Sequence, residues 1–394
     1  MALFTRFPMA QVGSHRGLTP PAVAVHATSA AHSQILALDG IRGVAILLVL
    51  CYHLARSLAA EFDFVNRFHL LASFGWVGVD LFFVLSGFLI TGILYDSKGH
   101  THFFKNFYVR RALRIFPLYF SALFFLLLLR AVWPDLGLYG HASDVWLWLY
   151  LTNFVIAVHD YGAFGLMDHF WSLAIEEQFY MLWPFVVFSL SRRGAMFMAL
   201  AMCIAAPLLR TAFALTQDNP AAIYVLSPMR MDSLAMGALL ALAIRGGAEG
   251  MAPERLRLPA IWGGGLAVAL LLLTILVTRN VSPHTLPMET YGFSLVAMAG
   301  AATIVLSMTT SLRHVFENGV LRWFGKYSYG LYVWHPILWM IIFHSDKARA
   351  LRNGEGTAEM IASVLVAVLA LLAFVMASWH LMESQFLKLK GRFQ

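Results

Sequence analysis

Ten apolar segments, each long enough to cross a lipid bilayer as a helix, constrain the fold of this chain most strongly. They lie at about 38–58, 74–95, 115–133, 171–190, 194–215, 228–245, 258–278, 289–309, 326–344 and 358–380. A membrane-spanning helix needs about 20 mostly apolar residues. The chain is 60% hydrophobic and only 12% charged, whereas a soluble domain is about 25% charged. The sequence therefore predicts an all-α integral membrane protein, a bundle of about ten transmembrane helices.

One further apolar run, 145–158, has a length that is more typical of a re-entrant or interfacial helix than of a spanning one. The distribution of Lys and Arg supports that interpretation. If the run does not cross and the N-terminus lies inside, the inner segments hold 18 basic residues and the outer segments hold 7. If the run crosses, the split becomes 11 inside and 14 outside. We therefore expect one short non-spanning helix here, and both termini in the cytoplasm.

The expected domain organisation has three parts. Residues 1–34 lack a sustained apolar run and are expected to form a disordered cytoplasmic tail. Residues 35–383 form the transmembrane domain, and residues 384–394 form a basic cytoplasmic tail. The net charge of +7 is explained by loop Lys and Arg that orient the spans. No nucleic-acid partner is therefore expected.

Ionisable residues inside two apolar segments are the first candidates for function, because a charge at mid-bilayer costs about 2.5–3.5 kcal/mol. Arg42 and His53 are eleven residues apart, which places them on nearly the same helix face, about 16 Å apart along the axis. Ser172, Glu176 and Tyr180 repeat every four residues and share a face. Glu176 and His53 have matching predicted depths. We therefore predict that His53 acts as a base toward a hydroxyl and that Glu176 orients it, in preference to a lone histidine bonded to a backbone carbonyl.

Further polar residues lie within the apolar segments. Arg210, Arg230 and Asp232 fall near the outer ends of their spans, and we expect them to form a polar chamber that is open to the outside and faces His53. Asp80 has no partner that the sequence can assign. His335 precedes Pro336, which kinks or loosens a helix, and the sequence leaves both a structural and a functional role open for this histidine.

Two more clusters each have a structural and a functional interpretation. Arg111 and Arg114, with Lys105 nearby, either anchor the third segment at the cytoplasmic side or bind the phosphates of a cosubstrate such as coenzyme A. Ser86 and Gly87 either pack against a neighbouring helix or line a narrow passage for an acyl group. The sequence has no nucleotide-binding loop, zinc-ligand spacing or serine-esterase elbow, so no metal and no permanently bound cofactor is expected.

Six strings, in order along the chain, resemble the membrane-bound acyltransferase family 3, whose members O-acylate extracytoplasmic sugars. They are LDGIRGVAILLVLCYH, GVDLFFVLSGFLIT, FYVRRALRIFPLY, FWSLAIEEQFYMLWP, RMDSLAMGALLA and SYGLYVWHPI. The resemblance covers residues 38 to about 383, and it implies that the segment 35–383 is an acyltransferase domain. One departure is the string GKYSY at 325–329, where members often have Gly-Asp-x-Ser-Tyr. The fused extracytoplasmic hydrolase-like domain of some members is also not expected here.

The resemblance implies roles for individual residues. His53 would be the essential histidine, and Arg42 would be its motif partner. The matches on the donor side, where acyl-CoA would bind, are Phe82, Phe83, Ser86, Gly87, Arg111 and Arg114. The string around the family's carboxylate contains Ser172, Glu176, Phe179 and Tyr180, and we expect Ser172 and Tyr180 on the acceptor side.

The expected function is transfer of an acyl group, most simply acetyl, from cytoplasmic acyl-CoA to a hydroxyl of an extracytoplasmic glycan or lipid-linked sugar. The expected location is a bacterial inner membrane. Membrane lipids and, as an option, a protein that delivers the acceptor complete the expected partners. A relay through an acylated side chain is an alternative order of events. A transporter or flippase that uses the same His, Glu and Arg residues is the alternative function, although no inverted repeat is visible.

Overall fold

The computed structural model describes residues 22–59, 73–133, 140–217, 219–246, 250–343 and 357–393. Within these ranges every regular element is helical, which confirms the all-α fold. Eight helical segments in these ranges are long and apolar enough to span a membrane, namely Leu36–Ala55, Phe74–Asp96, Phe103–Val132, Arg192–Thr216, Pro220–Ile244, Pro253–Thr278, Met288–Thr309 and Val364–Arg392. Large apolar side chains such as Trp262 and Leu276 are exposed, as expected for helices that face lipid.

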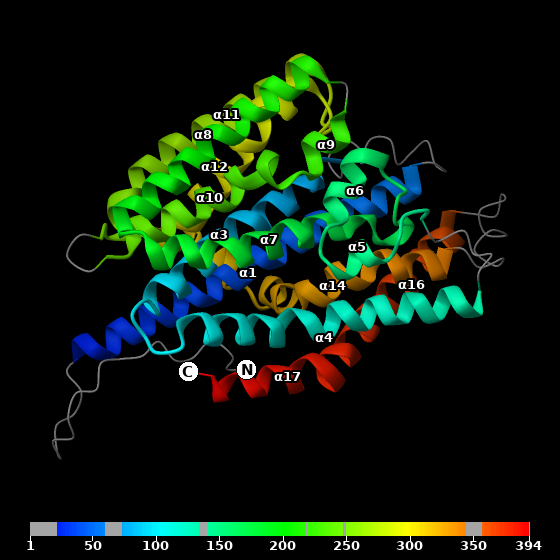
Figure 1. Cartoon of the computed structure of the whole chain (residues 1–394), viewed down its shortest axis with the longest axis horizontal. Helices are drawn as coiled ribbons and strands as arrows, with labels where there is room; N and C mark the ends of the chain where they lie inside the picture. Colours follow the sequence, from blue (N-terminus) through cyan, green and yellow to red (C-terminus); the bar gives the residue numbers. More distant parts are fainter. Residues whose placement is uncertain are drawn as a thin grey trace.

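The long helices surround a central group. α1 (Ala22–Ala59) packs against α3 (Val77–Asp96) and α14 (Gly319–Phe343), and α3 also contacts α7 (Trp171–Ser189) (Figure 1). On one side of this group, drawn at the top of Figure 1, lie α8 (Arg192–Thr216), α10 (Ser227–Ile244), α11 (Arg257–Thr278) and α12 (Phe293–Thr309). On the other side lie α4 (Phe103–Val132), α16 (Thr357–Ser378) and α17 (Ser384–Lys388).

Shorter elements complete the described chain. They are the 3-10 helices η2 (Phe74–Trp76), η4 (Gly165–Phe170), η6 (Pro253–Leu256) and η9 (Leu389–Arg392), the π-helical turns η7 (Met288–Gly292) and η8 (Trp379–Glu383), and the short α-helices α9 (Pro220–Val225) and α13 (Arg313–Phe316).

Glycines allow the closest helix contacts of the bundle. A Cβ atom added at Gly43 of α1 would lie 1.9 Å from the carbonyl oxygen of Leu321 in α14. A Cβ atom at Gly87 of α3 would lie 1.9 Å from the carbonyl oxygen of Leu234 in α10. Backbones approach this closely in membranes only where small residues meet. Gly87 therefore packs against a neighbouring helix, α10, which was one of the two roles that the sequence left open for it.

The run 145–158 does not form a spanning helix. It contains α5 (Val145–Trp148) and α6 (Thr152–His159), which are much shorter than the roughly 20 residues that a crossing needs. Tyr150, between them, has a φ of 55°, which interrupts a right-handed helix. Both short helices lie toward one end of the bundle (Figure 1). The run thus forms two short helices where one was expected, and neither is long enough to span a membrane.

Several segments differ from their expected bounds. α1 begins at Ala22, so the expected tail 1–34 overlaps a helix from residue 22, while residues 1–21 lie outside the described residues. The expected C-terminal tail 384–394 is helical in α17 and η9, which pack against α4. The expected segments 171–190 and 326–344 form α7 and α14, which are not among the eight candidate spans. In α7 the three consecutive polar residues 176–178 lower the mean hydropathy. The number of ten crossings stays a prediction.

Candidate functional site

A cavity between α1, α3, α4, α7 and α14 gathers most of the predicted site residues. The predicted residues on its walls are Arg42, Phe82, Phe83, Ser86, Arg111, Arg114, Ser172, Glu176 and Tyr180. These residues come from strings that are far apart in the sequence, and the bundle brings them to one place. Glu177 and Tyr332 also line the cavity, and the sequence analysis did not single them out. Each lies within one of the family strings, so those strings could have identified both residues from the sequence.

Three arginines form a basic cluster on the cavity wall. α4 begins at Phe103, so Arg111 and Arg114 lie inside this helix, three residues apart and therefore on one face. Arg42 of α1 lies near enough to both that the three positive charges repel one another. Arg42 also pairs with Asp39 at 2.8 Å, and the Arg111 guanidinium lies 4.8 Å from the centroid of the Tyr180 ring. Guanidinium groups collected in this way match the geometry of phosphate oxygens.

Glu176 ties two helices together at the cavity. Its Oε1 atom accepts a hydrogen bond from Ser86 of α3 at 2.7 Å, and its Oε2 atom accepts one from Tyr180 at 3.0 Å. Among the described contacts Glu176 and His53 do not bond directly, so the expected pair is not found. Equal depth in the membrane does not make two helices neighbours, and α3 contacts both α1 and α7. The Nδ1 atom of His53 instead lies 2.9 Å from the carbonyl oxygen of Val49, one turn earlier in α1.

His53 belongs to a cluster of three histidines, defined here as His53, His169 and His335. The ring centroids of His53 and His335 are 4.8 Å apart, and those of His169 and His335 are 5.5 Å apart. They come from α1, η4 and α14. His335 was considered from the sequence, whereas His169 was missed, although it lies only three residues before Ser172. Within the part of the chain that the structure describes, no group of three His, Cys, Asp or Glu side chains is arranged to hold a metal ion.

Tyr332 connects the histidine cluster to the cavity. It lines the cavity, and its ring centroid lies 5.5 Å from that of His169 and 5.9 Å from that of His335. Its hydroxyl donates to the carbonyl oxygen of His169 at 3.0 Å and contacts the hydroxyl of Ser172. The cavity and the histidine cluster are therefore adjacent, and a hydrogen-bonded pair of hydroxyls lies at their boundary.

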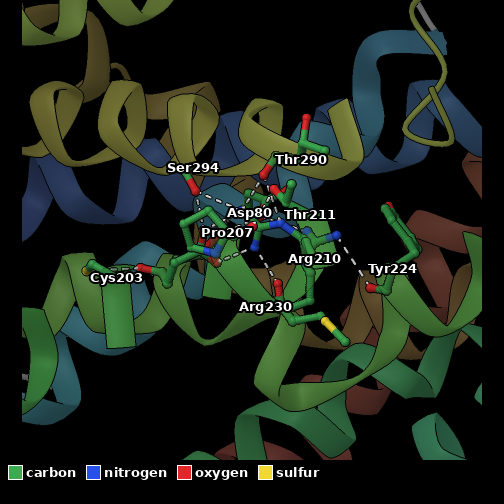
Figure 2. Close-up of polar contacts among 12 residues, drawn as sticks. Asp80, Cys203, Pro207, Arg210, Thr211, Tyr224, Arg230, Thr290 and Ser294 are labelled. Atoms are coloured by element: carbon green, nitrogen blue, oxygen red, sulfur yellow. Dashed lines mark hydrogen bonds and ion pairs between the residues drawn. The ribbon is translucent and has the colours of Figure 1, made fainter. Parts of the chain in front are cut away.

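The predicted open chamber of Arg210, Arg230 and Asp232 does not exist. Arg210 and Arg230 are 0% exposed, and Asp232 is 1% exposed. Arg210 donates two hydrogen bonds to Asp232, at 2.9 and 3.1 Å, and Arg230 pairs with Asp80 at 2.7 Å (Figure 2). These charges neutralise one another because an unpaired charge is costly inside a membrane. They join α3, α8 and α10, and they identify Arg230 as the partner of Asp80.

The comparisons with known proteins match this architecture. A family model described as an acyltransferase domain matches residues 35–382. Peptidoglycan O-acetyltransferase OatA of Listeria monocytogenes is 27% identical over 329 residues, which cover 79% of this chain and 50% of that protein. YrhL of Bacillus subtilis, provisionally named a peptidoglycan O-acetyltransferase, is 29% identical over 328 residues, which cover 78% of this chain and 49% of that protein.

The chain thus spans about half the length of the curated relatives it matches. No solved structure matches it. The family match covers nearly all of the membrane domain, and it confirms the family resemblance that the six strings indicated. This chain belongs to the membrane-bound acyltransferase family whose motifs it carries.

Proposed function

We propose that this protein transfers an acyl group, most simply acetyl, from acyl-CoA at the cytoplasmic face to a hydroxyl of an extracytoplasmic glycan. Membership of an acyltransferase family favours this function over a transporter or flippase. The names of the relatives favour peptidoglycan as the acceptor. The observation that carries the proposal is that the basic cluster, the cavity and the histidine cluster are contiguous.

The donor would enter at the basic cluster. Arg42, Arg111 and Arg114 supply guanidinium groups for the phosphates of coenzyme A. Along α1, Arg42 and His53 are separated by about 16 Å, a distance comparable to the reach of an extended pantetheine arm. The thioester would then lie near Ser172 and Tyr332, at the boundary with the histidine cluster. Ser86, with Phe82 and Phe83 on the same wall, would line the route.

His53 would act as the general base. Its Nδ1–H donates to the carbonyl of Val49, so Nε2 is the atom that accepts a proton in the neutral ring. This contact fixes the tautomer, which is the task that the sequence analysis assigned to Glu176. The acceptor oxygen would form a bond to the thioester carbonyl carbon while its proton passes to Nε2. The carbon–sulfur bond then breaks, and the coenzyme A thiolate leaves and takes up that proton.

The proposal includes an orientation. The protein would lie in a bacterial inner membrane as a multi-pass protein with both termini in the cytoplasm. The end of the bundle that holds α5 and α6 (Figure 1) would then face outward, where a glycan or a lipid-linked sugar is accessible. A partner protein that delivers the acceptor is compatible with this arrangement.

The test is acetyl transfer by the purified full-length protein in nanodiscs, with radiolabelled acetyl-CoA and soluble peptidoglycan glycan strands. General-base catalysis contributes about 10²–10⁴-fold, so His53→Ala is expected to lose at least about 100-fold in transfer. His100→Gln is the matched control, because His100 is exposed in the connection between α3 and α4. A folded His53→Ala variant with nearly full transfer would contradict the base. Absence of acetyl-CoA consumption by the wild type would contradict the donor.

A further inference from the structure

Two buried histidines outside the donor cavity each have a ring nitrogen without a hydrogen-bond partner among the described residues. They are the Nε2 atoms of His169 and His335, whose side chains are 8% and 1% exposed. A buried polar atom without a partner destabilises a fold, so such atoms require an explanation. In both rings the other nitrogen is bonded.

The protonation pattern of His335 follows from its neighbour. Pro336 has no backbone N–H and cannot bond to the carbonyl oxygen of Tyr332, which is four residues earlier in α14. The Nδ1 atom of His335 lies 2.8 Å from that carbonyl oxygen and 3.0 Å from that of Leu331. A carbonyl only accepts, so Nδ1 carries the hydrogen and Nε2 is left as an acceptor.

His169 has the same arrangement. Its Nδ1 atom lies 2.9 Å from the carbonyl oxygen of Leu166, and the backbone of Tyr332 and Val333 in α14 also lies beside the ring. In the tautomer that donates from Nδ1 to Leu166, Nε2 is an acceptor. In each ring, Nδ1 is bonded to the residue's own segment, and Nε2 therefore points away from that segment. The ring centroids of His169 and His335 are 5.5 Å apart, and that of His53 is 4.8 Å from His335, so η4, α14 and α1 each contribute one imidazole to the same region.

We propose that His169 and His335 bind the acceptor, and that their Nε2 atoms receive hydrogen bonds from hydroxyl groups adjacent to the one that is acylated. This inference rests on the proposed function and assigns the acceptor subsite. A site built from acceptor atoms selects a ligand rich in O–H donors, which is the chemistry of a sugar. His53 takes the proton of the attacking hydroxyl, while His169 and His335 hold the same sugar ring in place.

The location of this subsite suits the reaction. Tyr332 and Ser172 separate it from the cavity that would hold the thioester, so the acceptor and the donor approach the same boundary from opposite sides. Arg210, Arg230 and Asp232, which the sequence analysis placed in a chamber open to the outside, form buried ion pairs instead. Their charged groups already bond to one another, whereas the Nε2 atoms of the two histidines have no hydrogen-bond partner among the described residues.

The experiment compares His335→Phe and His169→Phe with His335→Gln and His169→Gln in the full-length protein in nanodiscs. Phenylalanine keeps the ring volume but leaves a sugar hydroxyl unpaired, whereas glutamine retains an acceptor oxygen. Loss of one such bond corresponds to about a 5- to 150-fold change. We expect KM for a soluble peptidoglycan disaccharide to rise by this factor in the Phe variants and to be largely restored by Gln. KM for acetyl-CoA and the slow hydrolysis of acetyl-CoA without acceptor should stay unchanged, as should all values for His100→Gln.

Two results would overturn the inference. One is an unchanged disaccharide KM in folded Phe variants, and the other is an equal rise of KM for acetyl-CoA, which would indicate a purely structural role. Calorimetric binding of the disaccharide in the absence of donor separates this inference from the proposed function. If the wild type binds disaccharide and the Phe variants bind it more weakly, the subsite stands even where acetyl-CoA is not consumed. Equal binding by all variants would reject the subsite while leaving the donor reaction intact.

Discussion

At the scale of single residues, the interior charges of this protein fall into two groups. Arg230 with Asp80 and Arg210 with Asp232 form buried ion pairs. Arg42, Arg111 and Arg114 instead line a cavity. The first group is explained by neutralisation within the bundle, and only the second is arranged to meet a ligand. The distinction depends on which side chains meet across helices.

The pair of Asp80 and Arg230 makes a prediction about stability. Asp80→Ala leaves the Arg230 guanidinium buried without its carboxylate, and breaking a buried pair in this way costs about 3–5 kcal/mol. Thermal unfolding in detergent should show this loss. The matched control is Asp96→Ala, because the pair of Asp96 and Arg245 is partly exposed, with side chains 32% and 22% exposed. Exposed pairs contribute about 0–1 kcal/mol.

A double variant tests whether the loss of stability comes from the unpaired charge. Replacing both partners, as in Asp80→Leu with Arg230→Met, removes the uncompensated charge, and we expect it to recover most of the lost stability. A double variant that is no more stable than Asp80→Ala alone would show that the pair does not act through its charges.

The sequence predicted which residues come together in the bundle better than it predicted which of them bond to one another. Motif strings identified His53, Glu176 and the cavity arginines. The His53–Glu176 pair is not found among the described contacts, because helical periodicity gives a face and a depth but not the adjacent helix. The open chamber was wrong for the same reason, since the carboxylate that neutralises Arg230 is 150 residues away in the chain. His169 was missed because it lies in η4, outside any apolar segment.

At the scale of elements, the apolar segments predicted the first and last residues of most helices to within a few residues. The prediction 258–278 corresponds to α11 (Arg257–Thr278), and 194–215 corresponds to α8 (Arg192–Thr216). The largest differences among spanning helices are at two N-terminal ends, since α1 begins at Ala22 and not near residue 38, and α4 begins at Phe103 and not near residue 115. In α4, Lys and Arg are good helix formers and extend the helix beyond the apolar run.

The contact between α3 and α10 gives a prediction at this scale. A Cβ atom at Gly237 of α10 would lie 1.9 Å from the carbonyl oxygen of Val84 in α3, so Gly237→Ala must push the two helices apart. Overpacking of this kind costs about 1–3 kcal/mol. Gly263→Ala is the matched control, because nothing lies within 4 Å of a Cβ atom there and alanine favours a helix. A lower Tm for Gly237→Ala than for Gly263→Ala is expected, and equal values would refute close packing as the role of Gly237.

At the scale of the whole molecule, the bundle has two chemically different ends. The connection between α3 and α4 lies at one end, and α5 and α6 lie at the other (Figure 1). The basic cluster and the histidine cluster are distributed along the same direction, since Arg42 and His53 are on one helix. Function as proposed therefore requires one orientation in the membrane, with the α3–α4 connection inside.

This orientation is testable by cysteine labelling. In a background with Cys51→Ala and Cys203→Ala, which removes both native thiols, single cysteines are introduced by His100→Cys and by Tyr161→Cys, at two exposed positions. A membrane-impermeant maleimide applied to intact spheroplasts should label the Tyr161→Cys variant at once and the His100→Cys variant only after permeabilisation. The reverse pattern would place the arginines on the outside and exclude entry of a cytoplasmic donor there.

The separation of Asp80 and Arg230 along the chain also has a consequence for biosynthesis. Translation at about 5–20 residues per second needs roughly 8–30 s to add the 150 residues between them. During that time α3 carries a carboxylate whose partner has not yet been made. We therefore expect the early helices to stay beside the insertion machinery until α10 has been synthesised. The synthesis of Arg230 would then determine when the nascent bundle is released into lipid.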